Sequence, residues 1–167
     1  GGGILMWLGI HWLDLTTLIS GERITEVAGF QGVVGGTPLK AEDSAALALR
    51  FESGAHGTMN AGYYTDKGYH SFIKLWGADG WLEYQEHLGG RTAMPLKWYS
   101  NRDPQSGIVE YDGAMEPKGY TPWVRRCVRA CAGLTGAPLS GAEGLRALRT
   151  IFAFYESAEK GTVVAVG

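Results

Sequence analysis

The sequence contains few charged residues and almost no imbalance between the two signs. Only 19% of its 167 residues are charged, and 15 basic against 17 acidic side chains leave a formal net charge of -2. A surface that binds phosphate backbones requires clustered lysine and arginine, which this composition does not provide. We therefore expect no nucleic-acid partner.

Long hydrophobic runs are also missing. The longest apolar stretch, residues 4–10, is far shorter than the roughly 20 residues that a bilayer-spanning helix requires. No basic segment precedes it, as a signal peptide would need. We therefore expect no membrane partner and interpret the protein as soluble and cytoplasmic.

Cysteine is scarce, since the chain has only Cys127 and Cys131. One pair does not indicate a disulfide framework. It is also too few for a structural zinc site, and no CxxC or HExxH motif supplies further ligands. We interpret both residues as small buried core residues and expect no bound metal.

Nucleotide-binding glycine motifs are absent, although glycine itself is abundant. The chain has 26 glycines, more than twice the average usage of about 7%, yet neither a G-x-G-x-x-G nor a P-loop occurs. The glycines of residues 32–36 have neither the required spacing nor a following helix, so they predict a turn. Without a glycine turn at a helix N-terminus, we expect no NAD or NADP to bind to this chain alone.

The hydrophobic patterns that are present predict an α+β fold. Residues 4–20 are apolar at nearly every position, which predicts a helix that is buried all round and ends at Gly21. Strict alternation then predicts antiparallel strands, before the chain returns to helical spacing. This order differs from the alternating strands and helices of a doubly wound nucleotide-binding domain. The expected strands are 45–51 paired with 58–64, 72–76 paired with 81–84, 97–101, 108–111 and 162–166.

The two later helices carry apolar stripes that predict packing. In the helix at residues 122–134, Val124, Cys127, Val128 and Cys131 share one face, with arginines on the other. Ser140 and Glu143 form a capping box that begins the last helix, and Gly161 ends it. The stripe of this last helix that we expect to face the core consists of Leu145, Leu148, Ile151, Phe152 and Tyr155.

The first helix carries two ionisable residues before its last turn, His11 and Asp14. They are separated by one helical turn and therefore lie on one face. Burying an imidazole and a carboxylate on such an apolar helix costs several kcal/mol unless both are paired, so the pair indicates a function. Because histidine exchanges protons near neutral pH, His11 is the candidate acid or base for oxidising an alcohol. The alternative is a purely structural role in the core, in which Asp14 merely orients or neutralises His11 or caps a backbone group.

Residues 1–14, GGGILMWLGIHWLD, resemble the G-G-G-x-x-x-D-x-G-x-H-x-x-D segment of the Gfo/Idh/MocA oxidoreductase family, which includes glucose-fructose oxidoreductase and inositol dehydrogenase. Further segments follow in the family's order and approximate spacing, so that the likeness covers nearly the whole chain. These segments are Glu42-Asp43-Ser44-Ala45, the second hairpin from Ile73 to Leu82, and residues 140–158.

The resemblance implies the C-terminal domain of such an oxidoreductase. This domain has a large, mostly antiparallel sheet with helices on one face, and its other face often forms a dimer. An N-terminal Rossmann domain, which binds NAD or NADP and supplies a lysine, is absent from the chain. His11 matches the catalytic histidine of the family, and Asp14 matches an acidic residue with a supporting role. The chain opens on glycine rather than methionine, so we expect residues 1–167 to be one domain, a fragment or a proteolysed product of a longer protein.

The sequence departs from the family at Trp7, where an aspartate often stands. Tryptophan cannot accept a proton, so either Asp14 assumes more of the role or the chemistry differs. Trp7 is either a stacking wall for a ring-shaped substrate or a core residue. In the family, the region of Tyr63, Tyr64 and Lys67 approaches the substrate pocket, although tyrosines at strand ends often serve packing alone.

Two functions are compatible with these residues. The first is an NAD(P)-dependent dehydrogenase that acts, together with its Rossmann domain, on a CH–OH group of a sugar, cyclitol or diol. The second is a non-catalytic binding or dimerisation module derived from that family, favoured by the loss of the aspartate at Trp7. In either case an exposed sheet face predicts a homo-oligomer.

Overall fold

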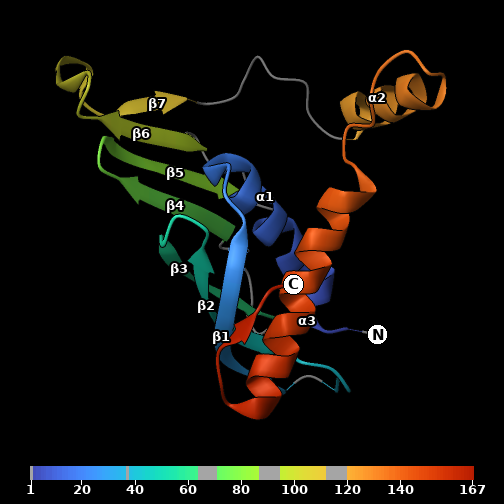
Figure 1. The fold of residues 1–167 in the computed structure, drawn as a ribbon. Coiled ribbons are helices and arrows are strands. Elements are labelled where there is room, and N and C mark those ends of the chain that lie inside the picture. Colours follow the sequence, from blue (N-terminus) through green and yellow to red (C-terminus); the bar gives the residue numbers. More distant parts are fainter. Residues whose placement is uncertain (1, 37, 64–70, 87–94, 112–119) are drawn as a thin grey trace. The chain divides into compact units, whose positions relative to one another are not determined.

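A computed structural model describes residues 2–36, 38–63, 71–86, 95–111 and 120–167 (Figure 1). The chain divides into two compact units, of which the first joins Gly1–Tyr64 to Leu139–Gly167 and the second is Thr65–Pro138. Each unit contains one antiparallel four-stranded sheet. The predicted α+β class is therefore confirmed, with the strands divided between two sheets.

The first unit packs two helices, α1 (Ile10–Ser20) and α3 (Gly141–Lys160), against the sheet of order β3-β2-β1-β8. A short π-helix, η1 (Leu5–Gly9), leads directly into α1. The hairpin predicted from strict alternation is present, since β2 pairs with β3 from Ser44↔Gly62 to Arg50↔His56. The strands of this sheet are β1 (Ile24–Gly32), β2 (Ser44–Phe51), β3 (His56–Gly62) and β8 (Val164–Ala165).

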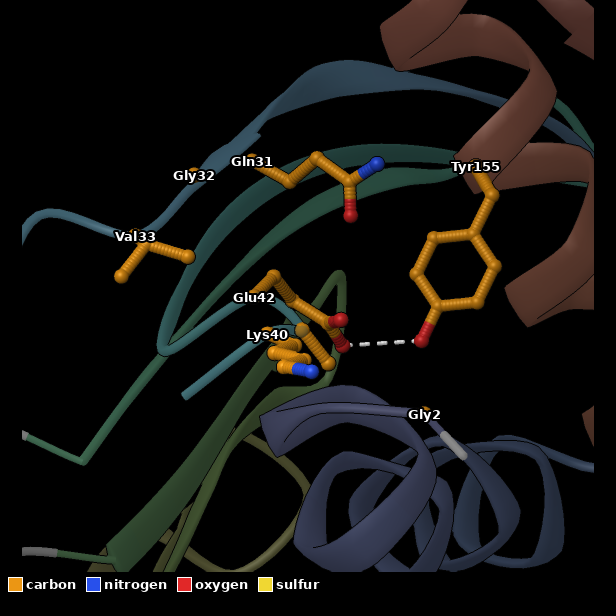
Figure 2. Close-up of a pocket in the computed structure, with 8 residues that line it drawn as sticks. Gly2, Gln31, Gly32, Val33, Lys40, Glu42 and Tyr155 are labelled. Carbon is orange, nitrogen blue, oxygen red and sulfur yellow. Dashed lines mark hydrogen bonds between the residues drawn. The ribbon is translucent and has the colours of Figure 1, made fainter. Parts of the chain in front are cut away.

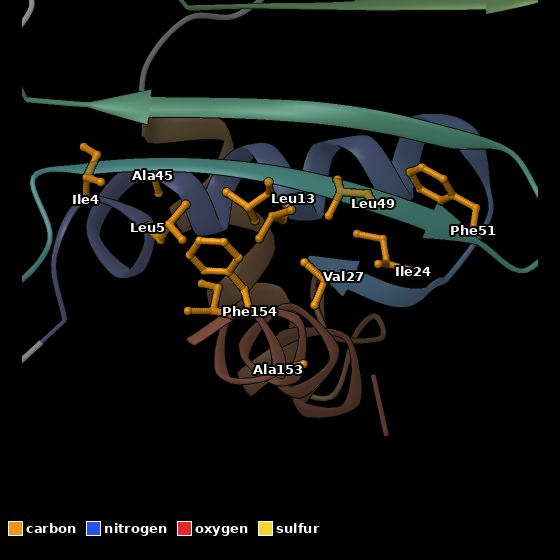
Figure 3. Close-up of a cluster of buried hydrophobic side chains, with 12 residues drawn as sticks. Ile4, Leu5, Leu13, Ile24, Val27, Ala45, Leu49, Phe51, Ala153 and Phe154 are labelled. Carbon is orange, nitrogen blue, oxygen red and sulfur yellow. The ribbon is translucent and has the colours of Figure 1, made fainter. Parts of the chain in front are cut away.

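The core of this unit lies between the sheet and its two helices. Every second residue of β2 is buried, and these side chains meet Leu13 of α1 and Phe154 of α3 (Figure 3). Phe154 is fully buried, as are Leu5 and Ile151. The buried cluster consists of Ile4, Leu5, Leu13, Ile24, Val27, Ala45, Leu47, Leu49, Phe51, Ile151, Ala153 and Phe154.

Helix boundaries follow the capping signals in the sequence. Gly21 ends α1 in the left-handed conformation, with φ of +70°, and its N–H donates to the Thr17 carbonyl. At the start of α3 the capping box is formed, with Glu143 N donating to Ser140 Oγ at 3.2 Å and Ser140 N donating to Glu143 Oε2 at 2.6 Å. Hydrogen bonds from the side chain and the backbone N–H of Ser140 to the Glu143 carboxyl lower the pKa of that carboxyl.

The prediction that the first helix is buried all round is wrong. Leu13 is the buried residue of α1, whereas Leu18 is 75% exposed and Ile19 is 39% exposed. The reason is geometric, because one sheet and one neighbouring helix cover only one side of a cylinder. Uniformly apolar composition thus did not reveal which side is covered.

The apolar stripes predicted for the other two helices are also corrected. In α3 two residues of the predicted stripe are confirmed, since Ile151 is fully buried and Tyr155 packs against the core. Leu145 and Phe152 of that stripe are 47% and 59% exposed, whereas Ala147 and Phe154 are buried. The buried stripe of α3 is therefore rotated relative to the predicted one.

In α2 (Thr121–Cys131), no residue is buried in the structure as described. Val124 and Val128 are exposed, Cys131 is exposed and Cys127 is half-buried, so the predicted core role of the cysteines is wrong. A helical period identifies an apolar face, but it does not supply a surface to cover that face.

The second unit contains the sheet of order β4-β5-β6-β7. Its predicted hairpin is present. Gly80 permits the close approach of the neighbouring strand, because a Cβ at this position would lie 1.9 Å from the Tyr99 carbonyl oxygen. The short 3-10 helix η2 (Pro104–Ser106) lies between the last two strands. These strands are β4 (Ser71–Gly77), β5 (Gly80–Glu86), β6 (Leu96–Ser100) and β7 (Val109–Tyr111).

A row of alternating charges crosses one face of this second sheet. Lys74 forms an ion pair with Glu83 at 3.1 Å, and Lys97 forms one with Glu110 at 2.8 Å. The register places Glu83 opposite Lys97, so the row is continuous from β4 to β7. The hydrogen bond to Glu110 raises the pKa of Lys97.

The core assignment in α3 is tested by two phenylalanines that are two residues apart. Phe154→Ala is expected to lower the free energy of unfolding by about 3–5 kcal/mol, because it opens a cavity in the core. Phe152→Ala, at a 59% exposed position, is expected to cost less than about 1 kcal/mol. Urea denaturation followed by circular dichroism measures both. Equal losses would show that the stripe predicted from sequence is the true one.

Candidate active site

The helix that carries the candidate residues has one buried side and one exposed side. Leu5, Gly9 and Leu13, spaced one turn apart, are buried against the core. Trp7 and His11 point the other way, with Trp7 70% exposed. We call the surface formed by Trp7, His11, Asp14 and Leu18 the outward face of this helix.

The predicted burial of His11 and Asp14 is wrong. His11 is exposed and Asp14 is partly exposed, because both lie on the outward face rather than on the core side. Within the described residues, no hydrogen bond or ion pair joins the two side chains. The backbone carbonyl of Asp14 accepts a hydrogen bond from Thr17 Oγ1 at 2.9 Å. The alternative in which both residues have only a structural role in the core is therefore also excluded. The His11 imidazole is accessible to a reactant.

Trp7 precedes His11 by one turn on the same face. Its exposure excludes the interpretation as a core tryptophan and leaves the stacking surface as a hypothesis. An exposed indole in an otherwise packed domain forms part of a surface that a ligand or another polypeptide can cover.

Two hollows open beside the start of this helix. The larger, of about 720 Å³, is lined by Tyr63 together with Gly2, Gly3 and residues 38–41. The smaller, of about 400 Å³, is lined by Gln31, Lys40, Glu42 and Tyr155 among others (Figure 2). His11 lines neither of them, so the structure brings Tyr63 to a concave surface but not to the imidazole. Tyr64 and Lys67 lie outside the described residues.

Glu42 and Asp43 are buried acidic residues that the sequence reasoning did not identify as important. Both precede β2, and their exposed fractions are 9% and 0%. Asp43 accepts hydrogen bonds from Val34 N at 2.8 Å and Gly35 N at 2.9 Å, which fixes the loop after β1. One feature of the sequence could have identified them: two adjacent carboxylates stand directly before a strand of alternating pattern. Buried carboxylates require several hydrogen-bond donors, so such a pair indicates a structural role.

The Glu42 carboxylate binds the start of the helix. It accepts hydrogen bonds from Gly3 N at 3.0 Å, Leu5 N at 3.2 Å and the Tyr155 hydroxyl at 2.8 Å (Figure 2). Burial, followed by the hydrogen bond to Glu42, raises the pKa of Tyr155, so its hydroxyl remains a donor. Among the described residues, no cluster of His, Cys, Asp or Glu is able to hold a metal ion.

A match to a family model extends these observations. Residues 1–83 match the GFO/IDH/MocA C-terminal domain. The chain belongs to the Gfo/Idh/MocA family. The matched segment contains the start of the helix, its outward face and the Glu42-Asp43 pair, so the recognition made from residues 1–14 and 42–45 is confirmed.

Known proteins of this family are similar along nearly the whole chain. D-apiose dehydrogenase from Rhizobium rhizogenes is 29% identical over 176 residues, which cover 96% of this chain and 48% of that protein. The aldose-aldose oxidoreductase from Caulobacter crescentus, solved with glycerol, has a TM-score of 0.81 at 22% identity and covers 98% of this chain and 48% of that one. The WlbA dehydrogenase from Bordetella pertussis, solved with NADH and UDP-GlcNAcA, has a TM-score of 0.75 at 23% identity, with coverage of 99% and 46%.

The chain thus spans about half the length of the relatives it matches. The structural matches establish the fold of the Gfo/Idh/MocA C-terminal domain. In addition, none of the helices in the described part of the chain has the length and apolar character needed to cross a membrane.

Gly3 tests how closely the helix start fits against Glu42. A Cβ on Gly3 would lie 1.9 Å from the Glu42 carbonyl oxygen, which is backbone and cannot move aside alone. Gly3→Ala is therefore expected to lower the free energy of unfolding by about 1–3 kcal/mol. Gly144→Ala is the control, because this helical position has open space around it and is expected to gain roughly 0.5–1 kcal/mol. Urea denaturation measures the free energy of unfolding of both variants. An unchanged value for Gly3→Ala would refute the close fit.

Proposed function

We propose that this domain is the substrate-binding and catalytic half of an NAD(P)-dependent dehydrogenase that acts on a CH–OH group of a sugar, cyclitol or diol. The observation that carries the proposal is the exposed imidazole of His11 on the outward face, inside the segment that matches the family. The relative named D-apiose dehydrogenase supports a sugar substrate, and the WlbA structure with NADH supports a nicotinamide cofactor. D-apiose is therefore the first substrate to test.

The described residues do not fit a dinucleotide by themselves. Both sheets are antiparallel, and the glycine turn that holds a pyrophosphate at a helix N-terminus is absent from the sequence. The nucleotide is held by a Rossmann domain of the intact protein in this proposal, and the nicotinamide accepts the hydride from the substrate carbon. NAD or NADP binding to this chain alone is not expected.

The residues of the outward face have distinct roles in the proposed reaction. The His11 imidazole accepts the proton of the substrate hydroxyl as the C–H bond breaks, and returns it in the reverse direction. Asp14 supports a positively charged imidazole electrostatically from the same face, without a direct hydrogen bond in this structure. Trp7 provides an apolar surface for the ring of a sugar.

The hollow lined by Tyr63 lies beside the start of the helix, and in this proposal it receives the distal part of the substrate. Tyr64 and Lys67 follow Tyr63 in the chain and are assigned to the same region on the basis of the resemblance alone. We also propose that the enzyme is cytoplasmic, since nicotinamide cofactors are available in the cytoplasm and its two cysteines form no disulfide.

His11 provides the test of catalysis in the intact protein. His11→Ala is expected to lower kcat with NAD and D-apiose by about 10²–10⁴-fold, since general acid–base catalysis contributes that much. His56→Ala is the control, because His56 is exposed on β3 in the same unit. Absorbance of the reduced nicotinamide measures both rates. If His11→Ala reduces the cofactor as fast as the wild-type protein does, the assignment of His11 as the acid or base is wrong. If the wild-type protein itself reduces no cofactor, the alternative of a non-catalytic module is favoured.

We also propose that the protein forms a homo-oligomer through the exposed face of the second sheet. Phe72 and Trp76 are 63% and 72% exposed and alternate with Lys74 on that face. The charge row reads Lys74, Glu83, Lys97, Glu110 across the sheet. A second copy related by a two-fold axis along the strands therefore places lysine opposite glutamate at every position.

Sedimentation velocity tests this self-association. The intact protein is expected to sediment as a dimer or larger, and Trp76→Ser is expected to shift it toward monomer, because a large exposed aromatic side chain is lost from the proposed contact face. Trp123→Ser in α2, at a 44% exposed position, is the matched control and is expected to leave the distribution unchanged. A wild-type protein that sediments as a clean monomer would contradict the proposal.

A further inference from the structure

The helix that carries His11 is held at its start by a residue from a distant part of the chain. Successive backbone N–H groups of Gly3, Ile4 and Leu5 all donate to Glu42: the first and third to its carboxylate, and the second to its carbonyl oxygen at 2.9 Å. The residue at the N-cap position, Ile4, supplies no side-chain hydrogen bond of its own. A carboxylate at this end also interacts favourably with the positive end of the helix dipole.

Tyr155 prevents the Glu42 carboxylate from turning away. Its hydroxyl donates to the same Oε1 atom that accepts from Leu5 N. Tyr155 belongs to α3, whereas Glu42 lies two residues before β2, so the helix start is tied to both α3 and the first sheet. Figure 2 shows the Tyr155 ring extending from α3 toward Glu42 above the helix start.

A π-helical turn separates this attachment from His11. The turn covers Leu5–Gly9, and the N–H of Ile10 reaches back to the Leu5 carbonyl. Such turns are rare and persist where neighbouring contacts define them. Because each residue of a helix turns the chain by about 100°, a change of one residue in this turn would rotate His11 away from the outward face. Leu5, at the beginning of the turn, is fixed by full burial and by Glu42.

We propose that Glu42 is a positioning residue for catalysis: by holding the first turn, it sets the rotation of the helix and thereby directs the His11 imidazole toward the substrate. Tyr155 assists by fixing the carboxylate. This inference rests on the proposed catalytic role of His11, and it assigns Glu42 no contact with the substrate.

The first experiment compares rates in the intact protein with NAD and D-apiose. Glu42→Gln preserves the volume but replaces one acceptor oxygen by a donor, so the side chain can no longer accept all three hydrogen bonds. kcat is expected to fall about 10- to 100-fold, as for a misplaced catalytic group, while KM for NAD stays unchanged. In the His11→Ala protein, Glu42→Gln is expected to cause no further loss, because the group it positions is gone.

Tyr155→Phe is the milder variant, and it serves if Glu42→Gln folds poorly. It removes one hydrogen bond from the carboxylate and is expected to lower kcat by a smaller factor than Glu42→Gln. Tyr120→Phe is its control, since Tyr120 is 85% exposed. Circular dichroism confirms that each variant is folded before its rate is measured.

A second readout does not depend on turnover. Diethylpyrocarbonate modifies exposed imidazoles, and mass spectrometry reports the rate at His11 with His56 as an internal reference. Glu42→Gln is expected to change the rate at His11 relative to His56. Unchanged modification with wild-type kcat, or an equal rate loss in the His11→Ala background, would overturn the positioning role. If turnover is unchanged in His11→Ala, the proposed catalytic role of His11 is wrong. The modification rates of His11 then show independently whether Glu42 sets the rotation of the helix.

Discussion

A single buried carboxylate at the start of a helix organises this domain. Glu42 is 39 residues from Gly3 and 113 from Tyr155 in the chain, yet it hydrogen-bonds to both. A buried carboxylate is stable only when its charge meets several donors, and the free N–H groups of a helix start are such donors. Each therefore satisfies the other, and the contact joins the helix, the sheet and α3. The absence of a side chain at Gly3 is a requirement of this contact, since any Cβ would collide with the Glu42 backbone.

The fixed helix start explains how a mostly apolar helix exposes an imidazole and a carboxylate on its surface. Leu5 and Leu13 dock in the core and Trp7 and His11 remain outside, which is the division that one sheet and one neighbouring helix impose on a cylinder. His11 is thus accessible without any cost of burying an ionisable group. The indole of Trp7 is available for the same reason, because nothing in the described part of the chain covers it.

Local features of the fold could be predicted from the sequence. Helix caps depend on neighbouring residues, and those predicted at Gly21, Ser140 and Gly161 are present. The hairpins depend on the alternation of apolar residues, and both predicted hairpins are present. Family membership followed from residues 1–14 and 42–45. The exposure of His11 could not be predicted, because a helix that is apolar on every side does not show which side faces the core. The exposure of α2 and the orientation of the buried stripe of α3 could not be predicted for a related reason. Both depend on packing partners that are distant in the sequence.

The role of Glu42 was hidden for a different physical reason. Its partners are backbone N–H groups and one tyrosine, which have no sequence pattern of their own, so only tertiary structure reveals them. The most direct test of the whole account is a crystal structure of the intact protein with NAD and a bound polyol. We expect a His11 ring nitrogen within hydrogen-bond distance of a ligand hydroxyl, and the Glu42 carboxylate still accepting hydrogen bonds from Gly3 N and Leu5 N. A ligand bound elsewhere, with His11 facing only solvent, would contradict it.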